Sequence, residues 1–253
     1  MANGTISYRG HELNRGSMSP SNSTFEYFED FCGTLWEMDK TGGADSTAEV
    51  QYPGVYVSTA GTTATLTEVA DGATAGGSIS FAAASTTIEG LSIPTCSVDA
   101  DAGDWLIEAR VKVTTLGAVI FAFGLQENVS VTASLAQTGG AAGDDVVMMF
   151  YDSGTGTAGN LESTVSKNTD ATSNSNGENT GMTGAQLVAG SFHRLAIRHD
   201  SGLGKVFFYF DGNLVDEVAN TNVSDQILHP FIGTGGSALG AIVVDYVYVL
   251  ADR

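Results

Sequence analysis

Basic residues are scarce in this 253-residue sequence. Ten Lys and Arg stand against 29 Asp and Glu, which gives a formal net charge of −19 at pH 7. Nucleic acids and anionic membrane surfaces are bound through clustered Lys and Arg, whose charges displace counterions. The sequence therefore predicts a protein whose partners include neither nucleic acid nor a membrane.

Long apolar runs are also missing. The longest candidates, residues 117–125 and 241–251, are shorter than the roughly 20 apolar residues that a membrane-spanning helix requires. The first residues lack the charged and then apolar layout of a secretory signal. We therefore expect a soluble protein that is kept in the cytosol or assembled there.

Proline and cysteine are rare, with four and two copies, while hydrophobic residues make up 42% of the chain. This composition argues against a fibrous or disordered chain and allows a full hydrophobic core. Cys32 and Cys96 form no Cys-x-x-Cys pair, which argues against a metal knuckle. Without a secretory signal, we expect two reduced, buried thiols.

Glycine is abundant instead, with 32 copies, and it separates short segments with strand-like alternation. In residues 104–113, apolar side chains alternate with Glu108, Arg110 and Lys112. This two-residue period is typical of a half-buried strand. Residues 192–199 repeat the pattern, with Arg194 on the polar face.

The remaining segments also favour strands. Asp211-Gly212 lies between two apolar runs and predicts a hairpin turn. No segment sustains helical periodicity over three turns, so we predict an all-β protein, a two-sheet antiparallel β-sandwich. The further strand-like runs are residues 55–57, 63–69, 78–82, 119–125, 129–135, 146–152, 205–210 and 241–250.

The first 24 residues differ from the rest. They are polar and slightly basic, with Arg9 and Arg15 against Glu12. We predict an extended N-terminal arm over residues 1–24, docked on its own body or on a neighbour, and a single domain over residues 25–253. Within that domain, residues 153–186 are rich in Ser, Thr, Asn and Gly. They predict a long polar loop with one hairpin around residues 161–165.

Four segments resemble a known family. The chain resembles the concanavalin A-like lectin/glucanase jelly roll in its laminin-G-like form, of the kind seen in tailed-bacteriophage virion proteins. The resemblance implies a jelly-roll sandwich over residues 25–253, in a fold whose members bind sugars, hydrolyse glycans or build protein surfaces. The segments that carry it are Phe28–Thr34, Gly190–Ile197 with its Phe192-His193-Arg194-Leu195, the aromatic Lys205–Val215 with Asp211-Gly212, and Val244–Val249.

A glucanase of this family would carry Glu-x-Asp-x-(x)-Glu along one strand, which places the carboxylates on one face for a retaining mechanism. The only Glu-x-Asp here is Glu37-Met38-Asp39, and no third carboxylate follows it. We interpret these residues as solvated acids in a turn. The sequence therefore predicts that the chain is not an enzyme and needs no cofactor.

The densest acidic cluster is formed by Asp99, Asp101 and Asp104. Alternating carboxylates in a tight loop can bind Ca²⁺, although an EF-hand loop would require a ligand where Gly103 stands. The alternative is a polar turn that leads into the following strand.

Two histidines, His193 and His199, share a strand face. Six residues of strand span about 20 Å, so they cannot bind one metal ion. We expect them to lie at the edge of the core.

Tyr209, Tyr246 and Tyr248 are candidate glycan-stacking residues. Aromatic rings combined with carboxylates can hold pyranose rings, which have an apolar face and a polar rim. The alternative is that these tyrosines alternate with core residues and simply cover a sheet.

These features predict a structural protein of a phage virion, assembled in the host cytoplasm. It would be a capsid decoration protein that docks on the capsid exterior and stabilises it. The arm, through Arg9, His11 and Arg15, would contact the major capsid protein or another virion protein. The chain would form a homo-oligomer, such as a trimer. The alternative is a glycan-binding, lectin-like module for attachment to a host or to polysaccharide.

Overall fold

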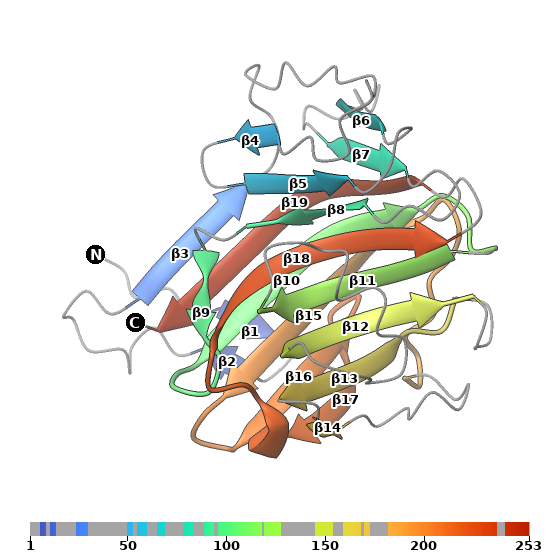
Figure 1. The fold of residues 1–253 in the computed structure, drawn as a ribbon. Helices are drawn as coiled ribbons and strands as arrows, with labels where there is room; N and C mark the ends of the chain where they lie inside the picture. The colour runs from blue at the N-terminus through green and yellow to red at the C-terminus, as the bar shows by residue number, and fades with distance from the viewer. Residues whose placement is uncertain are drawn as a thin grey trace.

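In the computed structural model, two antiparallel β-sheets pack face to face (Figure 1). The structure describes backbone and side chains at residues 25–28, 78–80, 90–93, 96–117, 119–127, 145–153, 159–167, 182–235 and 242–252. It describes the strand backbone alone at residues 6–8, 11–13, 24, 29, 50–52, 55–59, 65–68, 81–82, 89, 170–172, 236 and 241. The prediction of an all-β sandwich is confirmed. Across these described segments, no helix is long and apolar enough to cross a membrane.

One sheet has eight strands in the order β17–β16–β15–β10–β19–β7–β6, and β3 also pairs with β19. Strand β19 therefore has β10 on one side and both β7 and β3 on the other. The strands of this sheet are β3 (Thr24–Glu29), β6 (Thr65–Glu68), β7 (Ile79–Ala82), β10 (Trp105–Val113), β15 (Phe192–Asp200), β16 (Lys205–Phe210), β17 (Asn213–Ala219) and β19 (Ala241–Asp252).

The other sheet has nine strands in the order β14–β13–β12–β11–β18–β8–β5–β4, and β9 pairs with the start of β18. A short 3-10 helix, η2 (Asn220–Asn222), precedes β18. The strands of this sheet are β4 (Val50–Tyr52), β5 (Val55–Thr59), β8 (Glu89–Ser92), β9 (Val98–Asp99), β11 (Val119–Gln126), β12 (Val146–Asp152), β13 (Glu162–Lys167), β14 (Asp170–Thr172) and β18 (Ile227–Gly236).

The core lies between the two sheets, where alternate side chains of each strand meet. Ile107 on β10 faces Ile197 on β15 in the register, and both are fully buried. From the other sheet, Phe121 and Phe123 of β11 enter the same cluster. Because the side-chain period of a strand is two, the polar residues between these positions project from the outer faces.

The predicted hairpin turn is present between β16 and β17. Asp211 and Gly212 have φ values of 49° and 77°, the left-handed region that a two-residue hairpin loop requires at both positions. The Asp211 amide donates to the Arg194 carbonyl at 2.8 Å. Its carboxylate Oδ2 lies 2.9 Å from Nδ1 of His193, so the turn is fixed to β15.

A β-bulge interrupts the pairing of β10 with β19. Arg110 faces Tyr246 in the register, whereas the next residue, Val111, faces Val244. The extra residue is Asp245. A bulge changes the direction of the side chains beside it, and here Asp245 and Tyr246 lie together beside Arg110.

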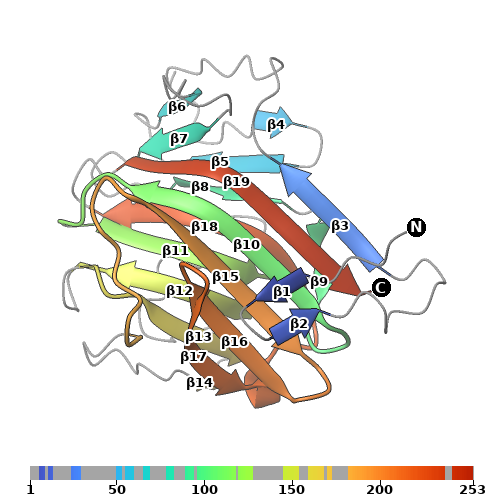
Figure 2. The same ribbon diagram turned by 180° about the vertical axis from the view of Figure 1, so that it is seen from behind.

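The N-terminal segment contains two short strands, where the sequence predicts an extended arm. Strand β1 (Ile6–Tyr8) pairs antiparallel with β2 (His11–Leu13). Figure 2 shows this hairpin in front of β10 and β15, and Figure 1 shows it behind them. The hairpin therefore lies on the outer face of the eight-stranded sheet.

That outer face holds a separate apolar cluster, which we call the outer apolar cluster. Its members are at most 2% exposed, although they project away from the core between the sheets. They are Leu106, Ala196, Phe207, Tyr209 and Leu250. The polar face expected from alternation is thus apolar in this half of the sheet.

Several sequence predictions fall on other parts of the chain. The described residues do not include Arg9, Arg15, Cys32, Glu37, the strand-like run 129–135 or the side chain of His11. Cys96 is buried, as expected. The predicted polar loop, residues 153–186, contains both β13 and β14, so part of it belongs to the nine-stranded sheet.

Candidate functional site

Three basic side chains project close together from the outer face of the eight-stranded sheet. Arg110 and Lys112 lie on β10, and Arg194 on β15 is directly opposite Arg110 in the register. Alternate residues of a strand share a face, which places all three on the same side of the sheet. They are three of only ten basic residues in the chain, so one small area holds much of its positive charge.

Phe192 holds two of these cations. It is opposite Lys112 in the register, and its ring centroid lies 4.4 Å from Cζ of Arg110 and 4.6 Å from Nζ of Lys112. A cation–π contact contributes about 0.5–1 kcal/mol at an exposed site. Phe192 therefore keeps two like-charged side chains near each other.

Two carboxylates accompany the basic residues. Asp245, which the bulge places beside β10, accepts a hydrogen bond from Nη1 of Arg110 at 2.6 Å. Glu108 is buried, and the Tyr246 hydroxyl donates a short hydrogen bond to it. Burial raises the pKa of Glu108, while the hydrogen bond from Tyr246 and the charge of Arg194 act in the opposite direction.

The same hydrogen bond affects the tyrosine. Burial, and then the hydrogen bond to the Glu108 carboxylate, raise the pKa of Tyr246 well above its usual range. Tyr246 therefore stays neutral at any physiological pH and acts as a hydrogen-bond donor.

Aromatic residues extend this surface toward β3. The Phe28 side chain is 57% exposed, and its ring centroid lies 5.7 Å from that of Tyr246. The Tyr248 hydroxyl donates to Glu26 at 3.1 Å. We call the following residues the basic–aromatic cluster: Phe28, Glu108, Arg110, Lys112, Phe192, Arg194, Asp245 and Tyr246.

The three tyrosines of the sequence prediction do not form one exposed platform. Tyr246 and Tyr248 are half-buried on the outer face of β19, but Tyr209 on β16 is fully buried. Its ring belongs to the outer apolar cluster, on the side of the sheet where the β1–β2 hairpin lies. A buried ring cannot stack on a sugar, so only Tyr246 and Tyr248 remain as stacking candidates.

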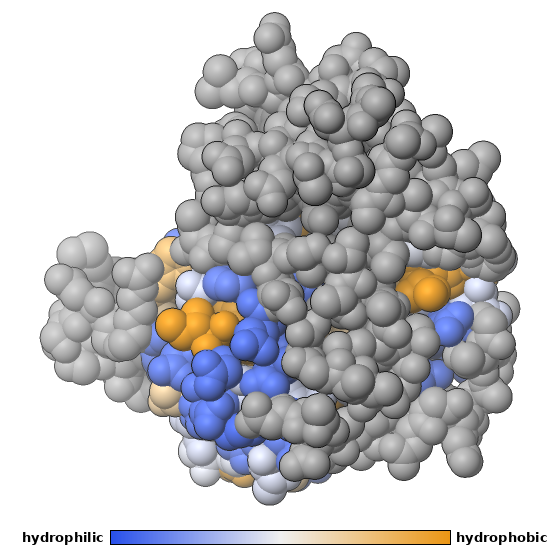
Figure 3. All heavy atoms as spheres, in the orientation of Figure 1, coloured by the Kyte–Doolittle hydropathy of each residue, from blue (hydrophilic) through white to orange (hydrophobic). Residues whose placement is uncertain are grey.

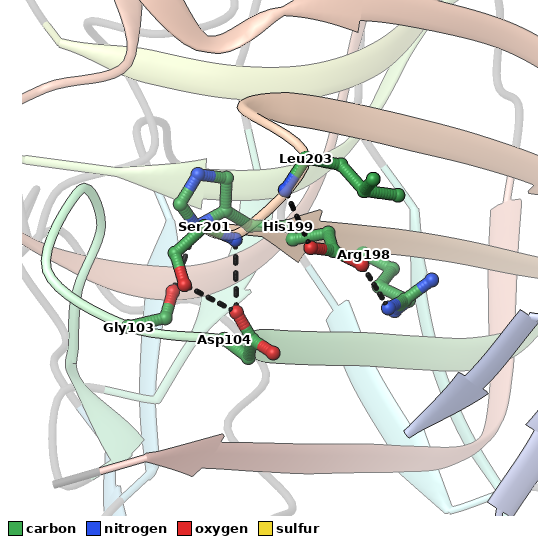
Figure 4. Close-up of polar contacts among 7 residues, drawn as sticks. Gly103, Asp104, Arg198, His199, Ser201 and Leu203 are labelled. Carbon is green, nitrogen blue, oxygen red and sulfur yellow. Dashed lines mark hydrogen bonds and ion pairs between the residues drawn. The ribbon is translucent and has the colours of Figure 1, made fainter. Parts of the chain in front are cut away.

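The acidic loop before β10 is bonded to the turn between β15 and β16 (Figure 4). Oδ1 of Asp104 accepts from the backbone N and the hydroxyl of Ser201, at 2.8 and 2.6 Å. Desolvation, and then the neighbouring Asp101, raise the pKa of Asp99. The three aspartates therefore do not share one partner, and the described residues contain no group of three or more potential metal ligands.

The two strand histidines lie at the core edge, as expected. His199 is fully buried and stacks on Trp105, with ring centroids 5.7 Å apart. Its Nδ1 lies 2.7 Å from the Gly103 carbonyl oxygen. His193 stacks on Phe210 at 4.7 Å, and both histidines therefore serve packing and loop anchoring.

The described surface at one end of the nine-stranded sheet is hydrophilic (Figure 3). Figure 3 shows hydrophilic residues gathered over β9, η2 and the start of β18, around a small hydrophobic group. Ile227, the first residue of β18, is 59% exposed. The described residues in this area form no continuous apolar surface (Figure 3), so they give no indication of an apolar docking surface.

Ionisable side chains that the sequence patterns did not reveal also lie on the outer face of the nine-stranded sheet. Glu162 on β13 is opposite Phe150 on β12 and is only 3% exposed. Its Oε2 has no hydrogen-bond partner. Burial, and then the charge of Asp152, raise the pKa of Glu162. Burial also lowers the pKa of His229 on β18.

Replacing Glu162 with glutamine is expected to stabilise the fold above pH 4.5, the ordinary pKa of Glu. A carboxyl whose pKa is raised by folding destabilises the native state when it ionises, so wild-type stability falls as the pH rises through the folded-state pKa. Urea unfolding of both proteins from pH 4 to pH 8 measures the difference, which should grow with pH. The exposed Glu217, which pairs with Lys205, provides the control Glu217→Gln. An equal gain in both variants would contradict the role of burial.

No known protein family matches the sequence, and no curated protein is significantly similar to it. Solved structures do match. Peanut lectin has a TM-score of 0.54 at 10% identity, covering 90% of this chain and 97% of the lectin. The carbohydrate recognition domain of Emp47p has a TM-score of 0.54 at 8% identity, with 81% and 91% covered. An endo-β-1,4-glucuronan lyase from the fungus Trichoderma reesei has 0.51 at 14% identity, with 88% and 94% covered.

These similarities confirm the expected fold, the concanavalin A-like jelly roll of lectins and carbohydrate-active enzymes. At such low identity they show the fold alone. The expected relation to virion proteins is not addressed by them and stays a prediction.

The prediction that the chain is not an enzyme is wrong. It rested on the absence of Glu-x-Asp-x-(x)-Glu, which excludes one catalytic arrangement only. A polysaccharide lyase shares the fold almost as closely as the lectins do, with a TM-score of 0.51 against 0.54. The fold and the missing motif together therefore do not exclude enzymatic activity.

Proposed function

We propose that this protein binds carbohydrate and that the basic–aromatic cluster is the surface that contacts the sugar. The observation that carries the proposal is the exposed Phe28 ring beside Tyr246, with charged donors and acceptors on the neighbouring strands. A pyranose ring has an apolar C–H face and a rim of hydroxyl groups, so a sugar site needs both chemistries in one place.

The polar groups of the cluster suit this task. The Arg110 and Arg194 guanidinium groups would donate hydrogen bonds to sugar oxygens, and the Asp245 carboxylate would accept hydrogen bonds from sugar hydroxyl groups. All lie on strands of the central part of the sheet and not on loops. Groups held by a rigid scaffold lose little conformational freedom on binding, which favours affinity.

The fold of the lectins supports the proposal at the level of architecture. Peanut lectin and the Emp47p carbohydrate recognition domain share the jelly roll, which shows that this arrangement of sheets is compatible with sugar binding. The location of the site on this chain rests on its own residues.

Replacing Phe28 with alanine is expected to weaken glycan binding about tenfold, because truncating an aromatic anchor is expected to cost about 1.4 kcal/mol of binding free energy. A glycan array with the full chain would identify a ligand, and calorimetric titration would then compare the variants. Leu203, 62% exposed in the turn between β15 and β16, gives the matched control Leu203→Ala. A blank array, or equal loss in both variants, would sink the proposal.

A second proposal concerns assembly into a virion, as a capsid decoration protein. The observation that favours it is the β1–β2 hairpin, a separate N-terminal element that lies on the body's outer face (Figure 2). In the virion, the β1–β2 hairpin would leave the outer face of its own sheet and dock on a neighbouring subunit or on a capsid protein. Co-sedimentation with capsids, compared between the full chain and residues 24–253, tests this mechanism, and undiminished association of the shorter chain would contradict it.

A further inference from the structure

We infer that the basic–aromatic cluster selects acidic polysaccharides, whose sugar residues carry a carboxylate. The inference rests on the proposed function and names its ligand class. Its starting point is an arrangement of like charges that the fold itself does not require.

Three positive charges are held together although like charges at neighbouring positions repel each other. Arg110 and Arg194 are directly opposite each other on β10 and β15, a position at which like charges destabilise a sheet. Lys112 follows on the same face of β10, and its ammonium and the Arg110 guanidinium both contact the Phe192 ring. Phe192 thereby concentrates positive charge instead of dispersing it.

The carboxylates nearby compensate this charge only in part. Asp245 pairs with Arg110, and Glu108 interacts electrostatically with Arg194 while it accepts the Tyr246 hydrogen bond. Within the described part of the chain, Lys112 has no ion pair. Lys112 therefore adds a positive charge that no described carboxylate pairs with.

A third carboxylate borders the cluster but is already occupied. Oδ1 of Asp211 accepts from the Arg194 backbone N at 2.8 Å, and Oδ2 lies 2.9 Å from Nδ1 of His193. This aspartate fixes the hairpin turn to β15.

The geometry at Arg194 suits a carboxylate ligand. Its side chain is exposed at the sheet surface, and its guanidinium lies against the hairpin turn, where a Cβ added at Gly212 would come within 2.6 Å of Nη2. The absence of a side chain at Gly212 leaves room for the guanidinium beside the turn. A planar guanidinium matches both oxygens of a carboxylate, which a hydroxyl group cannot reproduce.

The overall charge makes this inference testable. A chain with a net charge of −19 repels a polyanion at long range, so unspecific attraction would not produce binding. Binding of an acidic polysaccharide therefore requires a local site of opposite charge, and the basic–aromatic cluster is the described surface that offers one.

The experiment titrates the full chain with polygalacturonate and alginate, and with fully methyl-esterified polygalacturonate as the uncharged equivalent. We expect binding to the two acidic polymers and a loss of about tenfold or more on esterification, because each charged hydrogen bond is replaced by a weaker one. Arg194→Gln and Lys112→Gln should each weaken polygalacturonate binding by about tenfold. Lys205→Gln is the control, since Lys205 lies on β16 of the same sheet and pairs with Glu217 at 2.5 Å.

Each outcome decides a different question. Equal binding of the acidic and esterified polymers would overturn the acid selectivity and leave carbohydrate binding intact. Binding of other glycans on an array but of neither acidic polymer would also overturn it. If Lys205→Gln lowered the affinity for polygalacturonate as much as Arg194→Gln does, the overall charge of the protein would explain the binding and a local site would be contradicted. A protein that binds no glycan at all would overturn the proposed function together with this inference.

Discussion

Replacing Gly124 with alanine is expected to destabilise the sandwich by about 3 kcal/mol or more, at the upper end of overpacking effects. Gly124 lies on β11, and a Cβ added there would lie 2.1 Å from the backbone oxygen of Val147 and 2.6 Å from Cα of Met148. These are backbone atoms of the paired strand β12, so they cannot move without disturbing the β11–β12 ladder. Urea unfolding followed by tryptophan fluorescence measures the loss.

Gly117 provides the matched control. It lies between β10 and β11, and a Cβ added there would have no atom within 4 Å. Gly117→Ala is therefore expected to change the free energy of unfolding by no more than about 0.5 kcal/mol. If both alanine variants had the same stability, the close approach of β11 to β12 at Gly124 would be contradicted.

Deleting residues 1–23 is expected to expose the outer apolar cluster and to cause concentration-dependent self-association. The deletion removes β1 and β2 but leaves β3 intact. Leu106 and Tyr209 are almost completely buried on this outer face, and contiguous apolar patches exposed to water promote association. The dye ANS should fluoresce strongly with the shortened chain, and light scattering should show larger species as concentration rises.

A polar substitution within the cluster separates this effect from general unfolding. In the shortened chain, Leu106→Thr should reduce ANS fluorescence and association, because threonine suits a strand and lowers the apolar area. Circular dichroism should remain that of a β-protein in both chains. ANS fluorescence equal to that of the full chain would show that the hairpin does not cover this face.

The strands and the main turn could be predicted from the sequence because both depend on local information. Alternation in residues 104–113 required only the two-residue period, and the segment forms β10. Asp211-Gly212 required only residues that tolerate positive φ, and both have it. The resemblance in the C-terminal half added the jelly roll, which alternation alone does not specify.

The basic–aromatic cluster could not be predicted because it depends on register between distant strands. Arg110 and Arg194 become neighbours through the pairing of β10 with β15, and Asp245 joins them through a bulge that no local pattern indicates. Tyr209 looked equivalent to Tyr246 in the sequence, but its environment depends on the outer apolar cluster. The raised pKa of Glu162 has the same origin, since it comes first from burial on the sheet and then from the charge of Asp152 on another strand.

The place of β19 in the eight-stranded sheet has a consequence for the order of folding. β19 (Ala241–Asp252) pairs with β10, β7 and β3, although these partners precede it by more than half of the chain. During synthesis, β10 can pair with β15 as soon as both have left the ribosome, but its other edge stays open until β19 emerges. An open strand edge invites pairing with other chains. Until β19 has emerged, the nascent chain therefore presents an open edge of β10 that can pair with other chains.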